Sequence, residues 1–288
     1  VTGLEKGDPV LVSAVISCGE CLHCVSGRSH LCEAEWLRDA NWPLTAADGK
    51  PIAHFSRVGG FAEYVLVDQS QVVKLPGDMP LDRASLLACG VITGFGAVAW
   101  RAKVELGRSC VIIGVGGVGL NSVQAAFLCG AYPIIAVDVN DAKLEAARVF
   151  GASHTVNGST GDPIQAVKDL TEGRGADYVF VTVGSSSAMS QSVAMSAARG
   201  TAVWIGIPDV TETVQLLPFP LLKDERTITG CWMGSTNLKT DIPKLVNLYQ
   251  AGRLKLDELI TKRYRLEEVN EAMDAVVRGE ALRNIIIF

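Results

Sequence analysis

A glycine-rich turn between two apolar runs constrains the fold of this chain more than any other feature. The apolar runs cover 110–113 and 134–137, and the second one ends at Asp138. The turn contains four glycines, which are Gly114, Gly116, Gly117 and Gly119. Between the turn and the second run, apolar residues recur at helical spacing. The order strand, turn, helix and strand, with an acid nineteen residues after the last glycine, is typical of the dinucleotide-binding fingerprint.

The residue types of this stretch follow from the chemistry of a pyrophosphate. Glycine permits the tight turn, lets the backbone approach the phosphates and allows close packing of helix on strand, while the helix N-terminus offers free N–H groups. Asp138 can accept hydrogen bonds from ribose hydroxyls. One alternative is an ordinary packing turn. Another is a membrane span, because 109–137 carries no charged residue. Polar residues at 121, 122 and 124 and several glycines divide that run into short apolar pieces, which disfavours a span.

Composition predicts a globular α/β protein whose ligands are small molecules. The 288 residues are 48% hydrophobic and 20% charged, and the length suits two domains. A net charge of −5 predicts no nucleic-acid partner and no anionic membrane partner. We see no signal peptide and expect a cytoplasmic protein. The chain opens at Val1 and enters a strand pattern at once, so we expect an N-terminal truncation.

Four cysteines close together in sequence predict a metal site. Cys18, Cys21, Cys24 and Cys32 follow the pattern CxxCxxCx7C, which suits one tetrahedral zinc ion with every position filled and therefore a structural role. Two disulfides or an iron–sulfur cluster are the alternatives, and both are disfavoured by the cellular setting or by the spacing. His23 and His30 lie in the same loop and are not needed as ligands.

The remaining pattern predicts a mainly-β front part followed by alternating strands and helices. We expect strands over 60–67 and 72–75, a helical run from 81 to 100 that breaks near Cys89, and a helix over 187–199. The near-continuous apolar strands of the second part predict a parallel sheet covered on both faces. On chemistry alone Cys89 is a core cysteine, and the loop 33–57, with His54, either borders a substrate cleft or covers the surface.

Taken together, these motifs resemble the zinc-dependent alcohol dehydrogenases of the medium-chain dehydrogenase/reductase superfamily, over the whole chain. The residues that carry the resemblance are the cysteine cluster, 49–52, 54–55, 60–64, 87–90, 93–96, 114–119, 137–140 and Arg283. The resemblance implies a Rossmann doubly wound parallel sheet plus a GroES-like, mainly-β catalytic domain. We therefore expect the catalytic domain over 1–90, the NAD-binding domain over 91–232 and a C-terminal return to the catalytic domain over 233–288.

The resemblance also implies roles that the residues alone do not reveal. It makes Cys89 a catalytic-zinc ligand and Arg283 a partner of the pyrophosphate, and it places Lys143 at the ribose. It assigns four residues to the nicotinamide or adenine pockets, which are Thr93, Val183, Ile205 and Gly206. Cys110, Cys129 and Cys231 match no ligand position and are expected to be buried. In the family the other catalytic-zinc ligands precede the position of Val1, so the active site of this chain looks incomplete.

The expected reaction is a zinc-dependent, NAD-linked oxidation of an alcohol to an aldehyde or ketone, and its reverse. NAD is expected over NADP because Asp138 would repel a 2′-phosphate and Val139 and Asn140 bring no positive charge. The alternatives are an inactive fragment that binds dinucleotide and zinc, the same fold acting on a thiol-adduct of formaldehyde or a polyol, and a redox-active thiol protein. The resemblance implies a homodimer or homotetramer, for which 216–232 offers apolar residues.

Overall fold

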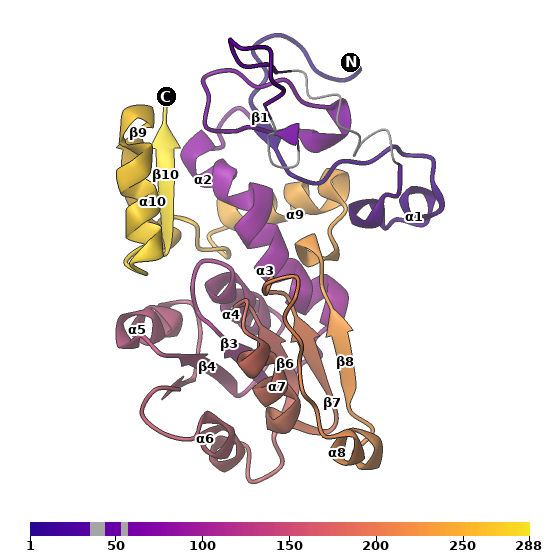
Figure 1. Ribbon diagram of the computed structural model, residues 1–288, viewed down its shortest axis with the longest axis vertical. Coiled ribbons are helices and arrows are strands. Elements are labelled where there is room, and N and C mark those ends of the chain that lie inside the picture. Colours follow the sequence, from indigo (N-terminus) through magenta and orange to yellow (C-terminus); the bar gives the residue numbers. More distant parts are fainter. Residues whose placement is uncertain (35–43, 53–56) are drawn as a thin grey trace. The chain divides into compact units, whose positions relative to one another are not determined.

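The computed structural model describes residues 1–34, 44–52 and 57–288 (Figure 1). Part of the loop 33–57, including His54, lies outside the described residues. The chain forms two compact units. Unit 1 comprises Val1–Ile92 and Thr236–Phe288, and unit 2 comprises Thr93–Ser235.

Unit 2 is built on a six-stranded parallel sheet. The strand order is β5-β4-β3-β6-β7-β8, and the pairings between neighbours are all parallel. The strands are β3 (Cys110–Ile113), β4 (Ile134–Asp138), β5 (His154–Asn157), β6 (Ala176–Val181), β7 (Ser196–Trp204) and β8 (Thr227–Gly230). The order reverses beside β3, because β4 and β5 extend the sheet on one side and β6, β7 and β8 on the other. Crevices at such a switch point, outside the carboxyl ends of the strands, are where open α/β sheets bind ligands.

Helices flank this sheet. They are α4 (Gly119–Leu128), α5 (Asp141–Val149), α6 (Pro163–Leu170), α7 (Ser186–Met195) and α8 (Pro218–Lys223). Of these, α5, α6 and α7 begin where the sequence provides capping side chains. Asn140 caps α5 by accepting hydrogen bonds from the N–H groups of residues 142 and 143, and Asp162 caps α6 ahead of Pro163. An acceptor at the N-cap satisfies N–H groups that the helix leaves unpaired, which explains why these helices start there.

The core of unit 2 lies where helix side chains meet the central strands. Val111, Ile112, Ile135 and Val179 are fully buried. The apolar cluster continues through Val181 and side chains of α6 and α7. Strands covered on both faces need apolar residues at consecutive positions, as the sequence predicts here. Cys110 and Cys231 are buried as expected, whereas Cys129, at the end of α4, is only partly buried.

Unit 1 contains two small sheets and several short helices. β1 (Val10–Val12) pairs antiparallel with β2 (Val72–Lys74), and β9 (Ile260–Arg265) pairs parallel with β10 (Arg283–Ile287). The helices are α1 (Leu22–Val25), α2 (Leu81–Leu86), α9 (Leu238–Gln250) and α10 (Val269–Val277), with 3-10 turns at Ser29–Leu31, Gln69–Gln71, Asp257–Leu259 and Leu266–Glu268. The C-terminal segment thus belongs to the same unit as the front part of the chain.

Three expectations about secondary structure are wrong. The segment 60–67 forms no strand, and no described residue pairs with it. An alternating pattern gives a strand only where another strand supplies backbone partners, and here Phe61, Tyr64 and Leu66 are exposed. The helix α7 ends at Met195 instead of 199, because Ser196 already pairs with Ala176 of β6. The helical run after position 81 also does not break near Cys89.

That run continues from Leu81 to Ala102 by changing its winding. After α2 it forms a π-helical segment, η5 (Leu87–Val91), then α3 (Ile92–Gly96) and a second π-helical segment, η6 (Ala97–Ala102). The glycines that suggest a break instead allow close packing, because a side chain on Gly96 would meet the carbonyl of Gly234. By length and composition Leu81–Ala102 could cross a membrane, but 56% of its most apolar window is buried, as in the core helix of a globular domain.

Candidate functional site

The glycine turn of unit 2 follows β3 and leads into α4. Gly114 has a positive φ of 84°, which an L side chain rarely adopts, and the Val183 side chain occupies the space where its Cβ would lie. The turn is closed by hydrogen bonds. The Gly114 N–H donates to the Val137 carbonyl at 2.7 Å, and the Thr182 hydroxyl donates to the Gly114 carbonyl at 2.5 Å. Thr182 is a residue that the glycine pattern does not reveal.

The other glycines of the turn differ in what surrounds them. A Cβ on Gly119 would run into the Gly114 carbonyl, so this glycine packs the start of α4 against the turn. A Cβ on Gly116 would meet nothing within 4 Å, so the backbone there faces open space. The carbonyl of Gly117 accepts a hydrogen bond from Asn121 at 2.7 Å. No side chain caps the N-terminus of α4. An open backbone beside uncapped helix N–H groups is the arrangement that receives a phosphate.

Asp138 stands at the end of β4 and is held by backbone donors. One carboxylate oxygen accepts the N–H of Val115 at 2.8 Å, and the other accepts the N–H groups of Val139 and Asn140 at 2.8 and 3.0 Å. These bonds tie the glycine turn to the tip of the next strand. Since a carboxylate offers about four acceptor positions, one remains for a ligand hydroxyl. Lys143 lies in the first turn of α5 and is half-buried.

Val183 connects several of the residues that the resemblance implicates in cofactor binding. Its side chain lies against Gly114, and its backbone lies where a Cβ on Gly206 would be placed. Val183 itself is 37% exposed, whereas Ile205 is buried. Thr93, which is half-buried, has a hydroxyl oxygen that is inaccessible to solvent and has no hydrogen-bond partner among the described residues. The ends of β3, β6 and β7 therefore bring Gly114, Val183 and Gly206 together.

The four clustered cysteines of unit 1 bring their sulfur atoms together beside α1, in what we call the cysteine cage. Their Sγ atoms lie within 4.8 Å of one another. The separations are 3.6 Å for Cys18–Cys32, 3.9 Å for Cys18–Cys24 and 4.0 Å for Cys21–Cys32. Tetrahedral zinc with bonds of about 2.3 Å separates its sulfur ligands by about 3.8 Å. A disulfide requires about 2.05 Å, so the geometry fits zinc and does not fit two disulfides.

Backbone N–H groups donate hydrogen bonds to sulfur atoms of the cysteine cage, which favours the negatively charged thiolate forms. The N–H of Cys18 donates to Cys32 Sγ and that of Cys21 to Cys18 Sγ, both at 3.3 Å. Hydrogen bonds from the backbone of Glu33 and Cys24 lower the pKa of the Cys21 thiol to about 6. Burial raises the pKa of Cys24 to about 12, which a bound cation would counteract. His23 stands outside the cysteine set, and its Nε2 lies 3.0 Å from the Glu33 carboxylate.

Cys89 is exposed and lies in the π-helical segment η5. A core cysteine would be buried, and π-helical turns occur often at functional positions. Next to it, the Arg283 guanidinium occupies the space that a side chain on Gly90 would need. Burial lowers the pKa of Arg283, and the neighbouring Cys89 opposes that effect. No described carboxylate forms an ion pair with Arg283, so its positive charge is available to an anion.

Two protein families and several known proteins are similar to this chain. The family description "Zinc-binding dehydrogenase" matches residues 117–251, and "Alcohol dehydrogenase GroES-like domain" matches residues 1–77. The chain is 34% identical over 303 residues to the alcohol dehydrogenase class-3 of Cereibacter sphaeroides, covering 100% of this chain and 80% of that protein.

Solved structures give the same result. Benzyl alcohol dehydrogenase from Acinetobacter calcoaceticus has a TM-score of 0.92 at 34% identity and covers 99% of this chain and 79% of its own. A putative zinc-binding dehydrogenase from Sinorhizobium meliloti 1021, solved bound to NADP, has a TM-score of 0.83 at 26% identity, covering 100% and 78%. The fold is thus a GroES-like domain plus a Rossmann-like domain.

The chain belongs to the zinc-binding dehydrogenases. Within that class it is an oxidoreductase of the alcohol dehydrogenase group, with zinc and NAD(P) as its cofactors. The expected family, fold and enzyme class are confirmed.

Proposed function

We propose that this protein oxidises an alcohol to an aldehyde or ketone with NAD rather than NADP as the acceptor. The observation that carries the choice of cofactor is the fixed carboxylate of Asp138, which three backbone N–H groups hold at the tip of β4. An immobile negative charge repels a 2′-phosphate, whereas its remaining acceptor position suits a ribose hydroxyl. Val139 and Asn140, which follow it, carry no positive charge.

The residues on the glycine turn bind and orient the dinucleotide in this proposal. Gly114, Gly116, Gly117 and Gly119 shape the turn, and Gly116 admits the pyrophosphate because nothing lies within 4 Å of its Cβ position. Lys143 adds a positive charge at the ribose, and Arg283 adds one for the pyrophosphate. Val183, Ile205 and Gly206 form an apolar wall that keeps water from the nicotinamide. The unpaired Thr93 hydroxyl is a donor or acceptor for the bound cofactor.

The cysteines divide into a structural set and a catalytic ligand. Cys18, Cys21, Cys24 and Cys32 would hold one zinc ion with no position left for substrate. Cys89, being exposed, would ligate a second zinc ion. A catalytic zinc, when bound, supplies a Lewis acid that lowers the pKa of the alcohol, and the nicotinamide accepts the hydride. Cys89 itself contributes a thiolate that anchors the metal and no proton transfer.

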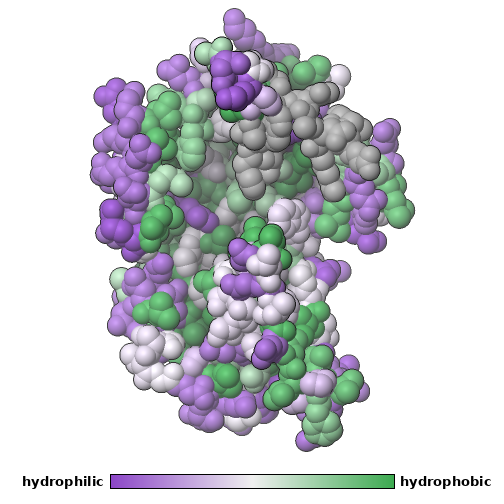
Figure 2. Space-filling model, viewed as in Figure 1, coloured by the Kyte–Doolittle hydropathy of each residue, from purple (hydrophilic) through white to green (hydrophobic). Residues whose placement is uncertain are grey.

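An exposed apolar surface favours self-association, so we propose a homodimer or homotetramer in the cytoplasm. Leu217, Phe219 and Leu222 are 77, 70 and 75% exposed on and beside α8, where Figure 2 shows apolar residues gathered. The neighbouring β8 is an edge strand of the sheet. Exposed apolar side chains beside an unpaired strand edge are the usual components of an interface. Light scattering that gave the mass of a single chain would contradict this proposal.

The cofactor preference is tested by titrating NADH and NADPH into the protein and its Asp138→Gly variant. We expect about tenfold weaker NADH binding and a much smaller preference over NADPH in the variant, because both the ribose acceptor and the repulsion are lost. Asp141→Asn is the matched control, since Asp141 lies three residues on, at the start of α5. Unchanged NADH affinity in Asp138→Gly would contradict the proposed role.

Metal content and turnover test the rest of the proposal. About two zinc ions per chain, falling to about one in Cys89→Ser together with a loss of alcohol oxidation, would support the assignment. One zinc ion per chain and dinucleotide binding without turnover would instead identify a binding protein. Comparing primary alcohols, polyols and a thiol-adduct of formaldehyde as substrates would define the substrate class.

A further inference from the structure

We propose that Asp82 is a positioning residue for Cys89, acting through the helix that carries both residues. The inference rests on the proposed function of Cys89 as a ligand of a catalytic zinc. It adds the side chains that determine where this thiol is held. None of them touches the thiol, so their effect must pass through the backbone.

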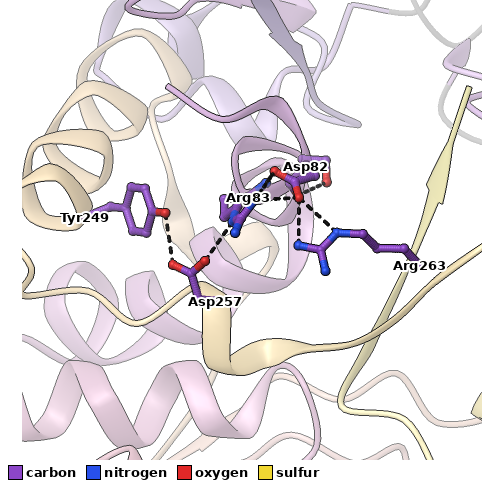
Figure 3. Close-up of polar contacts among 6 residues, drawn as sticks. Asp82, Arg83, Tyr249, Asp257 and Arg263 are labelled. Carbon is purple, nitrogen blue, oxygen red and sulfur yellow. Dashed lines mark hydrogen bonds and ion pairs between the residues drawn. The ribbon is translucent and has the colours of Figure 1, made fainter. Parts of the chain in front are cut away.

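Asp82 lies in the first turn of α2 and is the centre of an ionic cluster (Figure 3). Its carboxylate accepts hydrogen bonds from Arg263 Nε at 3.1 Å and Arg263 Nη2 at 2.8 Å. The same carboxylate accepts Arg83 Nη1 at 2.7 Å. Arg83 Nε donates to Asp257 at 2.7 Å, and Asp257 also accepts the Tyr249 hydroxyl at 2.9 Å. The cluster therefore joins α2 to three C-terminal elements, which are α9, the turn Asp257–Leu259 and β9.

Burial makes Asp82 the member on which the cluster depends. Its side chain is 16% exposed, compared with 44% for Arg263 and 50% for Asp257. Burial acts to raise the pKa of Asp82, but hydrogen bonds from Arg83 and Arg263 outweigh it and lower the pKa. Two acids and two arginines balance one another. Without the Asp82 charge, Arg263 would lose the carboxylate it pairs with, and Arg83 would retain Asp257.

The helix links the anchored residue Asp82 to Cys89. Cys89 follows Asp82 by seven residues, which is about two helical turns and about 10 Å. The change to π winding at Leu87 lies between them. Because the helix is held at its first turn, the backbone at Cys89 can move only if the residues between Asp82 and Cys89 bend or rewind. The π-helical part is the least regular portion of that segment.

The strand pair β9–β10 contacts this helical run at two places, at its first turn and near Cys89. Arg263 belongs to β9, and its partner in the register is Ile285 of β10. Arg283, two residues earlier on β10, packs against Gly90 beside Cys89. The Ser13 hydroxyl adds an uncharged contact next to Cys89 by donating to the Ala88 carbonyl at 2.7 Å. Fixing Asp82 to β9 therefore sets which part of the helix faces Arg283, and with it the position of the Cys89 thiol.

The test compares Asp82→Asn with a matched control, Glu271→Gln on α10, which removes a different ion pair to the same strand, β9. Lys262 of β9 and Glu271 of α10 form an ion pair of 2.8 Å with exposed fractions of 50 and 56%, and this pair joins β9 to α10 instead of to α2. We expect amide hydrogen exchange over 86–91 to be about tenfold faster in Asp82→Asn and unchanged in Glu271→Gln. We also expect weaker binding of the catalytic zinc, because the Cys89 thiol would be held less firmly. NADH affinity should be retained.

Further variants keep the proposal falsifiable if Asp82→Asn folds poorly. Arg263→Gln removes the more exposed partner of Asp82 and should reproduce the faster amide exchange over 86–91. Asp82→Glu keeps the carboxylate and should retain protection of these amides. Unchanged exchange over 86–91 in both variants, or an equal increase throughout unit 1, would overturn the proposal. Cys89→Ser separates the two ideas. If Cys89→Ser keeps its full zinc content, the proposed ligand role fails, whereas if it loses zinc and Asp82→Asn does not, only the positioning role fails.

Discussion

The glycine turn and the cysteine cage are held in their geometries by different forces. The turn rests on a buried sheet, and hydrogen bonds from Gly114, Thr182 and the backbone around Asp138 close it without any ligand. The cage lies beside α1, which has no buried residue, and the neighbouring turn Ser29–Leu31 has none either. We infer that the packing of unit 2 is sufficient to shape the nucleotide site, whereas the cysteine cage depends on bound zinc for its order.

The largest expected effect is therefore loss of the structural zinc. In Cys24→Ser, or after removal of zinc by a chelator, we expect 18–34 to become accessible to protease, because the binding free energy of a structural zinc, on the order of 10 kcal/mol, is what orders such a lobe. NADH binding to unit 2 should persist. Limited proteolysis and NADH titration on the same samples measure both effects.

Cys129→Ser controls for the loss of a thiol, since Cys129 is a free and partly buried cysteine outside the cage. It should keep its zinc content and its resistance to protease. If the lobe without zinc resisted protease as well as the lobe with zinc, the proposed difference between the two regions would be wrong.

Two alanine substitutions in the glycine turn separate packing from ligand binding. Gly119→Ala places a Cβ against the Gly114 carbonyl, so we expect unit 2 to lose about 2–3 kcal/mol of unfolding free energy and to bind NADH poorly. Gly116→Ala meets nothing within 4 Å, so its stability should change by less than about 0.5 kcal/mol while NADH affinity falls at least tenfold. Thermal unfolding and NADH titration distinguish them. Equal stability losses in the two variants would show that Gly116 is also a packing position.

The sequence predicts the parallel sheet and the family well because both depend on local patterns. Consecutive apolar residues specify strands such as 110–113, and Asp162 with Pro163 specifies a helix start, as the structure shows. The spacing of Cys18, Cys21, Cys24 and Cys32 predicts a cage because ligands close in sequence need little of the fold to meet. The roles of single cofactor residues come only from resemblance and remain predictions.

Other features depend on contacts between distant segments and could not be predicted. The pair Arg83–Asp257 joins residues 174 positions apart, and no local pattern selects one acid among 31 for that contact. In the π-helical segment around Cys89, Gly90 packs against Arg283, which also comes from far along the chain. The segment 60–67 shows the converse, because its alternating pattern is present but no strand among the described residues pairs with it.

The smallest expected effect tests how much unit 2 depends on polar contacts at the other end of β3. Asp177 accepts the N–H and hydroxyl of Ser109 at 2.9 and 2.6 Å and lies 3.3 Å from Arg108. Burial acts to raise its pKa, but the Ser109 hydrogen bonds and the Arg108 charge lower it below its usual 3.8. A lowered carboxyl pKa stabilises the fold above the unfolded-state pKa, and this contribution disappears as the pH falls through the folded-state pKa.

Asp177→Asn should therefore cost about 1 kcal/mol at neutral pH, a modest value because the side chain is 31% exposed. The deficit should be constant down to about pH 5 and shrink below about pH 4, where the wild-type carboxylate also becomes protonated. Asp169→Asn on α6 is the control, because this exposed acid accepts only a hydrogen bond from Gln165. Denaturant unfolding across this pH range measures the difference. A deficit that persisted unchanged at low pH would mean that Asp177 acts through its shape, and that charge contributes little to the stability of the nucleotide unit.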